Sequence, residues 1–334
     1  MKSLFRFTSL LCCLHPFSSA GQFDSLFNKF TFLKTKYDTA YIHDVPKNWE
    51  IFVYSQYKNN SFDWSDHTEK QTIFFDLLTN TSIGAGGSYQ NFSLSYGFAV
   101  STNQSDSSDA SGIDFITSLY VGQHIFDFGF RYYRGYYVSG YDSLSDQLLN
   151  IYRDDIATAN LFVNYLYNFN YERFSLNASF IGSQIQRKSA GAPLAGLLFN
   201  YNDLHANTSI VPPQFDSIHH ELLPVSEANI WTFGVLAGYA YTFVLPLHFY
   251  LTLSIIPGYA LNFGEAKTDE YFRIGAPATG SFKLISKNAF GYSGERIYGY
   301  VSISTDKDWI RLNKDDRYTN NLGKWRIQIG YLFN

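Results

Sequence analysis

The sequence predicts an all-β fold, a transmembrane antiparallel up-and-down β-barrel of about 12 strands. Hydrophobic residues make up 46% of the 334 residues although the mean hydropathy is −0.16, so apolar and polar side chains must be interleaved. Aromatic residues reach 19%, with 31 Phe and 27 Tyr against one Met, and aromatic side chains favour strands over helices. Long and short links between the predicted strands also alternate, as they do in outer-membrane barrels.

Residues 1–20 are predicted to be a signal peptide. Lys2 and Arg6 give a basic start, residues 7–14 form a short apolar core, and Ser18-Ser19-Ala20 supplies small residues for cleavage. The apolar core is too short to span a bilayer as a helix. We therefore expect the protein to be exported.

The mature chain would consist of a periplasmic N-terminal segment at 21–48 and the outer-membrane β-barrel at 49–334. Both cysteines, Cys12 and Cys13, lie inside the predicted signal, so the mature chain would have no disulfide framework and no thiolate metal site. Loss of two basic residues with the signal would change the formal net charge from −4 to −6. That balance disfavours nucleic acid as a partner.

Apolar residues recur at every second position in many segments, which is the period of a strand. Phe92, Leu94, Tyr96 and Phe98, for example, alternate with Ser93, Ser95 and Gly97. Large residues on one face and small or polar residues on the other suit a barrel that meets lipid outside and is crowded or wet inside. The predicted strands are 49–57, 81–89, 92–100, 113–121, 125–133, 156–167, 174–183, 231–245, 247–263, 282–292, 296–304 and 325–333.

The links between these strands fall into two classes. Short turns are predicted at 90–91, 122–124, 168–173, 246 and 293–295. Longer polar loops are predicted at 58–80, 101–112, 134–155, 184–230, 264–281 and 305–324. Because outer-membrane barrels have short periplasmic turns and longer extracellular loops, both chain ends are expected on the periplasmic side.

A helical membrane protein is the main rival to this architecture. No Asp, Glu, Lys or Arg occurs between Glu227 and Glu265, and the stretch is long enough to span a bilayer. Pro246 and Pro257 interrupt it, however, and its aromatic residues keep the two-residue period. Two adjacent strands explain this stretch better than two helices.

Several segments together resemble a known family. They are Tyr37-Asp38-Thr39-Ala40-Tyr41-Ile42, a first strand at Trp49, a hairpin at 84–98, and Gln186-Arg187-Lys188-Ser189-Ala190-Gly191. Their order and spacing resemble the domain of unknown function 4421 family of Bacteroidetes over about residues 37–333. The chain departs from the family pattern at Ala192, where Ser is usual, and at 78–80, where a Pro-Asn turn is usual. The resemblance implies an outer-membrane barrel and no established activity.

Polar residues on the predicted inner face are the best candidates for a functional site: Glu50, Gln56, Asp127, Arg131, Arg326 and Gln328. Charge is tolerated there because it can meet water or a partner inside the barrel. A site for conduction or for a ligand is one interpretation. A structural ion network that makes the barrel rigid or plugs it is an equally good one.

Other candidates for chemistry are weaker. Asp216, His219, His220 and Glu221 could hold a metal, but adjacent histidines on a polar loop are usually only solvated. Ser189 lacks visible His and acid partners for a role as nucleophile. No serine stands two residues after any histidine, so the His-x-Ser motif of twelve-stranded outer-membrane phospholipases is absent.

The sequence therefore favours a non-enzymatic outer-membrane barrel, either a pore or a ligand-binding or transport barrel. A structural, surface or envelope-assembly barrel is the first alternative, and an outer-membrane lipid hydrolase is the second. Expected partners are outer-membrane lipid and lipopolysaccharide and the barrel-assembly machinery, with no cofactor and no nucleic acid. The identity of any small-molecule ligand stays open.

Overall fold

A computed structural model describes residues 36–45, 49–66, 72–77, 81–89, 92–99, 111–142, 147–213, 225–268, 273–311 and 316–333. Residues 37–334 form one compact unit. The predicted signal peptide, both cysteines and the four metal candidates of the 216–221 stretch lie outside the described residues.

Most of the described residues lie in strands. The strands are β1 (Ile42–Asp44), β2 (Trp49–Asp66), β3 (Thr72–Leu77), β4 (Thr81–Tyr89), β5 (Phe92–Ala99), β6 (Ser111–Val121), β7 (His124–Asp142), β8 (Gln147–Asn168), β9 (Gln184–Gln186), β10 (Ala190–His205), β11 (Val225–Val244), β12 (Phe249–Thr268), β13 (Arg273–Ser293), β14 (Ile297–Arg311) and β15 (Asp316–Phe333). Two short 3-10 helices, η3 (Asn177–Ser179) and η5 (Pro246–His248), interrupt them.

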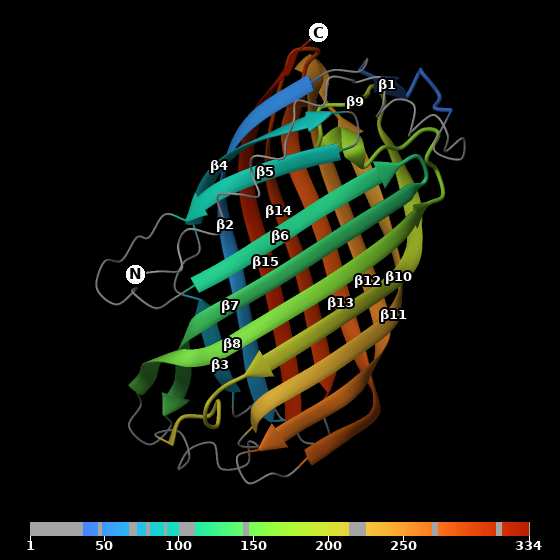
Figure 1. Cartoon of the computed structure of the whole chain (residues 1–334). Helices are drawn as coiled ribbons and strands as arrows, with labels where there is room; N and C mark the ends of the chain where they lie inside the picture. The colour runs from blue at the N-terminus through green and yellow to red at the C-terminus, as the bar shows by residue number, and fades with distance from the viewer. Residues whose placement is uncertain are drawn as a thin grey trace, which may run out of the picture. The chain divides into compact units, whose positions relative to one another are not determined.

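Ten strands close into an antiparallel ring, as Figure 1 shows from the side. Around the ring the order is β2, β15, β14, β13, β12, β11, β10, β8, β7 and β3, and β3 pairs back to β2. Three further strands lie outside the ring, because β4 and β5 extend from β2 and β6 pairs with β7. The predicted all-β antiparallel barrel is confirmed, but the wall is not a single ring of about 12 strands.

The connections between consecutive strands lie at two opposite ends of the barrel. Turns of two to four residues join β6 to β7, β11 to β12 and β13 to β14 at one end, here called the short-turn end. The opposite end, the loop end, carries the four-residue links from β7 to β8, β12 to β13 and β14 to β15 and the longer connection from β10 to β11. The predicted contrast between short turns and long loops therefore holds at this end only for the β10–β11 connection, because strands extend through the other predicted loops. Both Trp49 at the start of β2 and Phe333 at the end of β15 lie at the short-turn end, since they pair with each other.

A band of exposed large apolar side chains surrounds the half of the barrel nearer the short-turn end. On β2 and β15 it comprises Trp49, Ile51, Val53, Tyr57, Trp325, Ile327, Ile329, Tyr331 and Phe333. Because alternate side chains of a strand point to opposite faces, the residues between them point into the barrel. An outward apolar band with aromatic residues at its edges is typical of a barrel that crosses a membrane.

The strands continue well past this band, and their polarity then inverts. β2 has 18 residues and β8 has 22, whereas about 9–11 residues cross a bilayer. Beyond Tyr57 the outward residues of β2 include Ser61 and Asp63, while the inward Phe62 and Trp64 are buried. The stretches predicted as loops at 58–80, 134–155, 184–230, 264–281 and 305–324 therefore consist largely of strand.

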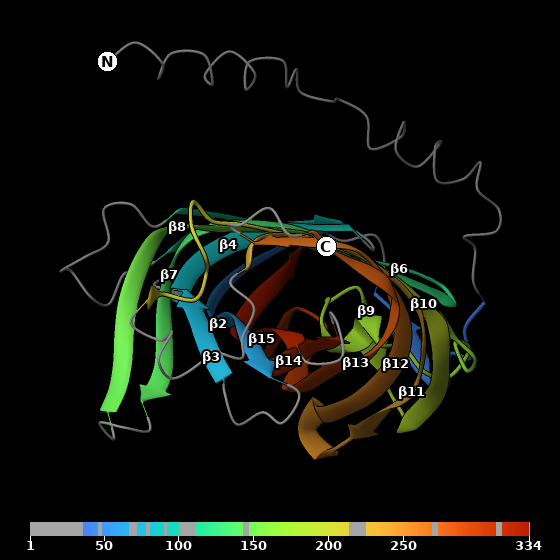
Figure 2. The same cartoon turned by 90° about the horizontal axis from the view of Figure 1, so that it is seen from below.

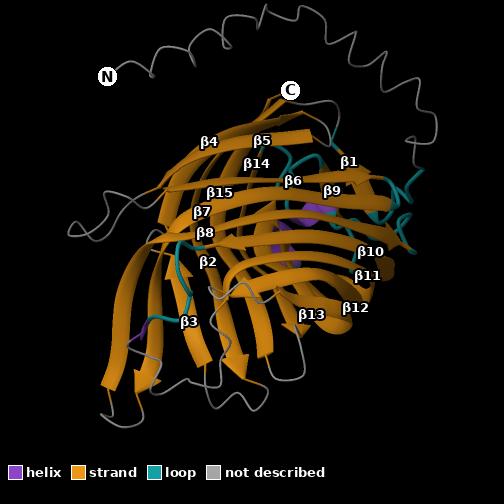
Figure 3. Ribbon diagram, turned by 60° about the horizontal axis from the view of Figure 1, so that its bottom comes forward, coloured by secondary structure: helices purple, strands orange, loops and turns teal. Residues whose placement is uncertain are grey.

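A segment inside the barrel replaces one predicted strand. Residues 174–183 were expected in the wall, but they contain η3 and form the centre of an inner plug, which we define as residues 169–189. Phe174 and Leu176 are buried within it, and β9 at its end pairs with β1. Figure 2 shows β9 inside the ring of strands, and Figure 3 shows the helical turn there in purple. The apolar residues of this segment are buried inside the barrel instead of facing lipid. The sequence pattern alone cannot distinguish such a buried segment from a wall strand.

The uncharged stretch between Glu227 and Glu265 forms the antiparallel strands β11 and β12, so the two-strand interpretation holds and the helical one is wrong. In the part of the chain that the structure describes, no helix has both the length and the apolar character needed to cross a membrane.

Candidate functional site

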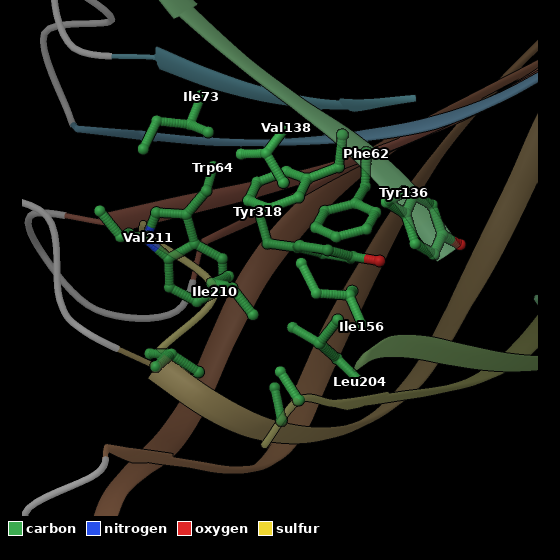
Figure 4. Packing of buried hydrophobic residues seen from close by; sticks show 14 of the residues in the cluster. Phe62, Trp64, Ile73, Tyr136, Val138, Ile156, Leu204, Ile210, Val211 and Tyr318 are labelled. Atoms are coloured by element: carbon green, nitrogen blue, oxygen red, sulfur yellow. The ribbon is translucent and has the colours of Figure 1, made fainter. Parts of the chain in front are cut away.

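An apolar core fills the barrel at the loop end. Phe62, Trp64, Tyr136 and Tyr318 lie at its centre, and Figure 4 shows them packed together with aliphatic side chains from several strands. The rings of Phe62 and Phe75 stack with centroids 4.2 Å apart. Side chains packed in this way exclude water from the lumen, as they do in the core of a soluble protein.

On the short-turn side of this core, a buried ion cluster connects β10, β13 and β14. Lys283 Nζ donates to Asp308 Oδ1 at 2.9 Å and to Oδ2 at 3.0 Å, and it also forms an ion pair with Asp306. Asn200 donates to Asp308 Oδ2 at 3.0 Å. Lys283 and Asp308 are each only 3% exposed. Buried charges persist when they are paired and hydrogen-bonded, as these are.

A second ion pair crosses the barrel. Lys287 Nζ on β13 lies 2.7 Å from each carboxylate oxygen of Asp127 on β7. In the ring of ten strands, β7 and β13 are five places apart in either direction. The pair therefore bridges opposite walls. Ser118 completes it by donating to Asp127 Oδ1 at 2.5 Å.

Arg131 and Asp114 form a third polar cluster beside β6. Arg131 Nε lies 3.9 Å from Asp114 Oδ1, and its guanidinium lies 4.8 Å from the centre of the Phe162 ring. Tyr133 donates to Asp114 Oδ2 at 2.8 Å, and Lys58 pairs with the same oxygen. The Nε and one terminal nitrogen of Arg131 are buried without a hydrogen-bond partner among the described residues.

Glu50 attaches the inner plug to the wall, and Gln328 shares its wall partner Tyr298. Glu50 accepts hydrogen bonds from Ser88 at 2.6 Å and from Tyr298, and the backbone N–H of Gly182 in the plug donates to it at 3.3 Å. Gln328 donates to the Tyr298 hydroxyl at 2.7 Å. These contacts give the two residues a structural role at the short-turn end.

All six residues that the sequence singled out lie on the inner face. Glu50, Gln56, Asp127, Arg131 and Gln328 are buried, whereas Arg326 is partly exposed. They do not form one site. Glu50 and Gln328 share the partner Tyr298 near the plug. Asp127 and Arg131 belong to separate ion clusters. Gln56 donates to Ser82 at 2.9 Å.

Two segments that carry the family resemblance meet in the plug. Ile42 pairs with Gln186 in the β1–β9 sheet, and Arg187 N–H donates to Tyr41 C=O at 2.7 Å. The Gln186 side chain accepts from Ser175 N–H at 3.0 Å and donates to backbone carbonyls, including that of Arg173 at 2.7 Å. The plug is thus held by a dense network of hydrogen bonds instead of by apolar contacts alone.

Ser189, the serine considered as a nucleophile, and two histidines have clear contacts. Ser189 Oγ accepts the backbone N–H of Val244 at 2.9 Å and so joins the end of the plug to β11. His124 Nδ1 lies 2.9 Å from the Tyr165 hydroxyl, and His205 Nδ1 lies 3.7 Å from Glu227. No group of three or more metal-ligating side chains occurs within the described ranges.

A cavity of about 570 Å³ opens through the wall between β5 and β6; we call it the side cavity. Its inner part is lined by Lys58, Asp114, Lys324 and Arg326, among others. The Arg326 guanidinium stacks on the Tyr54 ring at 3.8 Å from its centroid. A second cavity of about 730 Å³ lies at the short-turn end between the plug and the turns after β11 and β13.

Sequence reasoning missed most partners of the six candidates. The ion-cluster residues that it did not single out are Lys58, Asp114, Lys283, Lys287, Asp306 and Asp308. Asp306 and Asp308 fell in a predicted loop, although alternation with Val301, Ile303 and Trp309 continues through them. That unbroken period was the signal that could have placed them on the inner face.

Residues 36–333 match the family described as "Domain of unknown function (DUF4421)". The chain belongs to the DUF4421 family. The match covers every described strand of this DUF4421 barrel, and the family prediction is confirmed. No curated protein matches the chain.

Solved structures similar to the DUF4421 barrel include a protease and a transporter. The outer membrane protease OmpT from Escherichia coli is 9% identical, with 87% of this chain and 98% of that chain covered and a TM-score of 0.33. The toluene transporter TodX from P. putida is 8% identical, with 86% and 91% covered and a TM-score of 0.23. Neither similarity carries an activity or a substrate over to the DUF4421 barrel.

Proposed function

We propose that this protein is an outer-membrane barrel whose lumen is closed and which binds a ligand in its side cavity instead of conducting along its axis. The predicted signal at 1–20, the outward apolar band and the polar outward residues of β2 past Tyr57 support this location. The short-turn end would face the periplasm and the loop end, which carries the long β10–β11 connection, the cell exterior.

The cross-barrel pair of Asp127 and Lys287 carries the proposal of a closed lumen. It joins strands on opposite walls, so a solute that moves along the axis would have to break it. The apolar core around Trp64 lies on one side of this pair along the axis, and the inner plug lies on the other. An open channel needs a continuous water-filled path, and these three layers interrupt it.

Conductance tests this proposal directly. Folded protein, identified by its heat-modifiable gel shift, would be reconstituted in planar bilayers. We expect no conductance steps under conditions in which an open porin in the same lipid gives steps in every membrane. Regular single-channel steps from the folded protein would show that the lumen is open and would contradict the proposal.

The orientation makes a separate prediction. An epitope tag at 105–111 or at 312–315 should be labelled on intact cells, because β5 and β14, which precede these links, run from the short-turn end toward the loop end. A tag at Gly294 in the short turn before β14 should be labelled only after the outer membrane is permeabilised. Permeabilised cells provide the control that both tags are present. The reverse pattern would mean that the barrel is inverted.

A structural or envelope-assembly role is the remaining non-enzymatic candidate, and the second cavity, between the plug and the periplasmic turns, is the feature that favours it. We retain a non-enzymatic function because Ser189, the serine considered as a nucleophile, contacts a backbone N–H and belongs to the plug.

A further inference from the structure

The barrel wall is interrupted between β5 and β6. β5 pairs with β4 and β6 pairs with β7, but among the described residues the two strands share no hydrogen-bonded ladder. β3 closes the ring only at the loop end, where it pairs with residues 61–65 of β2. Nearer the short-turn end β5 and β6 are neighbouring edges, as Figure 1 shows. An unpaired edge inside a membrane is costly, so a ligand that fills the space would stabilise it.

The side cavity lies at this interruption and opens toward the lipid. Its rim includes Tyr96 on β5 and Ile113 and Phe115 on β6, which point outward and are 69%, 62% and 51% exposed. Ile116 points inward and is still 37% exposed, because no strand packs beside it. The cavity therefore has an apolar entrance within the wall and a polar interior.

Its interior carries excess positive charge. Lys58, Lys324 and Arg326 line it together with one carboxylate, Asp114, which Lys58 and Tyr133 already bind. Lys324 and Arg326 have no carboxylate partner in the described part of the chain. The Nε of Arg326 is buried without a hydrogen-bond partner. A cation that has lost water without gaining a partner favours an anion at the same place.

The fold holds Arg326 in this position. Gly84 on β4 and Gly97 on β5 face each other and leave room for the Tyr54 ring, since a Cβ on Gly97 would lie 2.6 Å from the Tyr54 hydroxyl. Tyr54 in turn supports the Arg326 guanidinium. Substitution of either glycine would displace the aromatic support of the cation.

The cations lie level with the edge of the apolar band. Lys58 on β2 pairs in register with Lys324 on β15. The next pair, Tyr57 with Trp325, faces outward and is the last pair of large apolar residues before the outer face becomes polar toward the loop end. Aromatic residues at this height mark the membrane interface, where lipid headgroups lie. A phosphate at the mouth of the cavity would thus be at its ordinary depth in the bilayer.

We propose that the side cavity binds the phosphate-bearing headgroup of an anionic lipid from the leaflet at the loop end, with the acyl chains lying over the exposed faces of β5 and β6. The proposal deepens the ligand-binding role proposed above and rests on it. A peptide strand added to β5 or β6 would satisfy the edges, but it would leave the cations at Lys324 and Arg326 unexplained.

Native mass spectrometry of the full-length folded protein tests the proposal. The probes are phosphatidylglycerol, phosphatidylcholine and inorganic phosphate, each added to the same detergent solution. We expect one phosphatidylglycerol to remain bound per barrel, with at least about tenfold higher affinity than phosphatidylcholine. A tenfold difference in affinity corresponds to the free energy of about one charge-assisted hydrogen bond. Inorganic phosphate should bind far more weakly.

The decisive variant is Lys324→Gln with Arg326→Gln, which should abolish the preference. Because neither cation has a carboxylate partner, the variant should keep the heat-modifiable shift of the folded barrel. Lys307→Gln with Arg311→Gln, two cations on the outward face of β14, is the matched control and should keep the preference. Ile116→Trp should block binding by filling the cavity without a change of charge.

Three results would overturn the proposal: a folded double variant that keeps the preference, equally tight binding of inorganic phosphate, or a polypeptide that copurifies and crosslinks to β5. Failure of the proposed function has a different signature. A conducting barrel that still prefers phosphatidylglycerol would refute only the closed lumen. A barrel that does not conduct and does not prefer phosphatidylglycerol would refute only the lipid site.

Discussion

Replacement of Lys283 by Met should destabilise the barrel by about 3–5 kcal/mol, the cost of breaking a buried ion pair from one side. Lys283 is the only cation in contact with Asp308 among the described ion pairs, and it also pairs with Asp306. Without it, Asp308, which is 3% exposed, would keep only its hydrogen bond from Asn200. The loss should appear in urea-induced unfolding in lipid vesicles, followed by Trp fluorescence and by the gel shift.

Lys307→Met is the matched control for this variant. Lys307 follows Asp306 on the same strand but faces outward, with its ammonium 5.0 Å from the centre of the Trp309 ring. Its replacement should change the free energy of unfolding by less than about 1 kcal/mol. Adding Asp308→Leu to Lys283→Met should restore part of the lost stability, because it removes the carboxylate left without a cation. Equal effects of the two lysine variants would mean that Lys283 is not buried among carboxylates.

The position of Lys283 shows where sequence reasoning succeeds and where it fails. Alternation of side chains predicts the inner or outer face for each residue of a strand, and five of the six candidates that it places on the inner face are buried. Which inner residues meet depends on the order of strands around the ring. Asp127 and Lys287 are 160 residues apart and lie on opposite walls, so no local pattern joins them.

Strand ends were missed for a different reason. The predicted β2 ended at Tyr57 because the outward apolar residues end there, although the strand continues to Asp66. Beyond the apolar band the outward side chains are polar and the inward ones form a core, so polar Asp63 and apolar Trp64 exchange the roles that the two faces have within the band. A period of two persists through this inversion, but a search for one continuous apolar face loses it.

The interruption between β5 and β6 could not be predicted from the sequence either. Both strands alternate as wall strands do, and an even count of strands suggested a continuous barrel. Pairing is a property of two edges together, and neither edge carries a signal of its own in the pattern of apolar residues. Only the exposure of inward Ile116 and the excess of cations beside it mark the opening.

The outward apolar band makes the second large prediction: Ile329→Arg should destabilise the barrel in lipid vesicles by about 2–4 kcal/mol. Ile329 is 58% exposed and pairs with Val53, which is 59% exposed, so we expect its side chain to face lipid near the middle of the band. An arginine there would place a charge in hydrocarbon. A shift of β15 by one residue would not relieve this cost, because it would turn the whole apolar row inward.

The control must lie on the outer face of the same strand. Gln328→Arg is unsuitable, because Gln328 is buried and binds Tyr298 and Tyr300. Asn321→Arg is suitable, since Asn321 lies an even number of residues from Ile329 and past the last apolar pair, where the outer face meets water. It should change the folding yield little. Equal loss of folded protein for Ile329→Arg and Asn321→Arg, judged by the gel shift, would show that the band around Ile329 does not face lipid, and the membrane-spanning barrel would have to be abandoned.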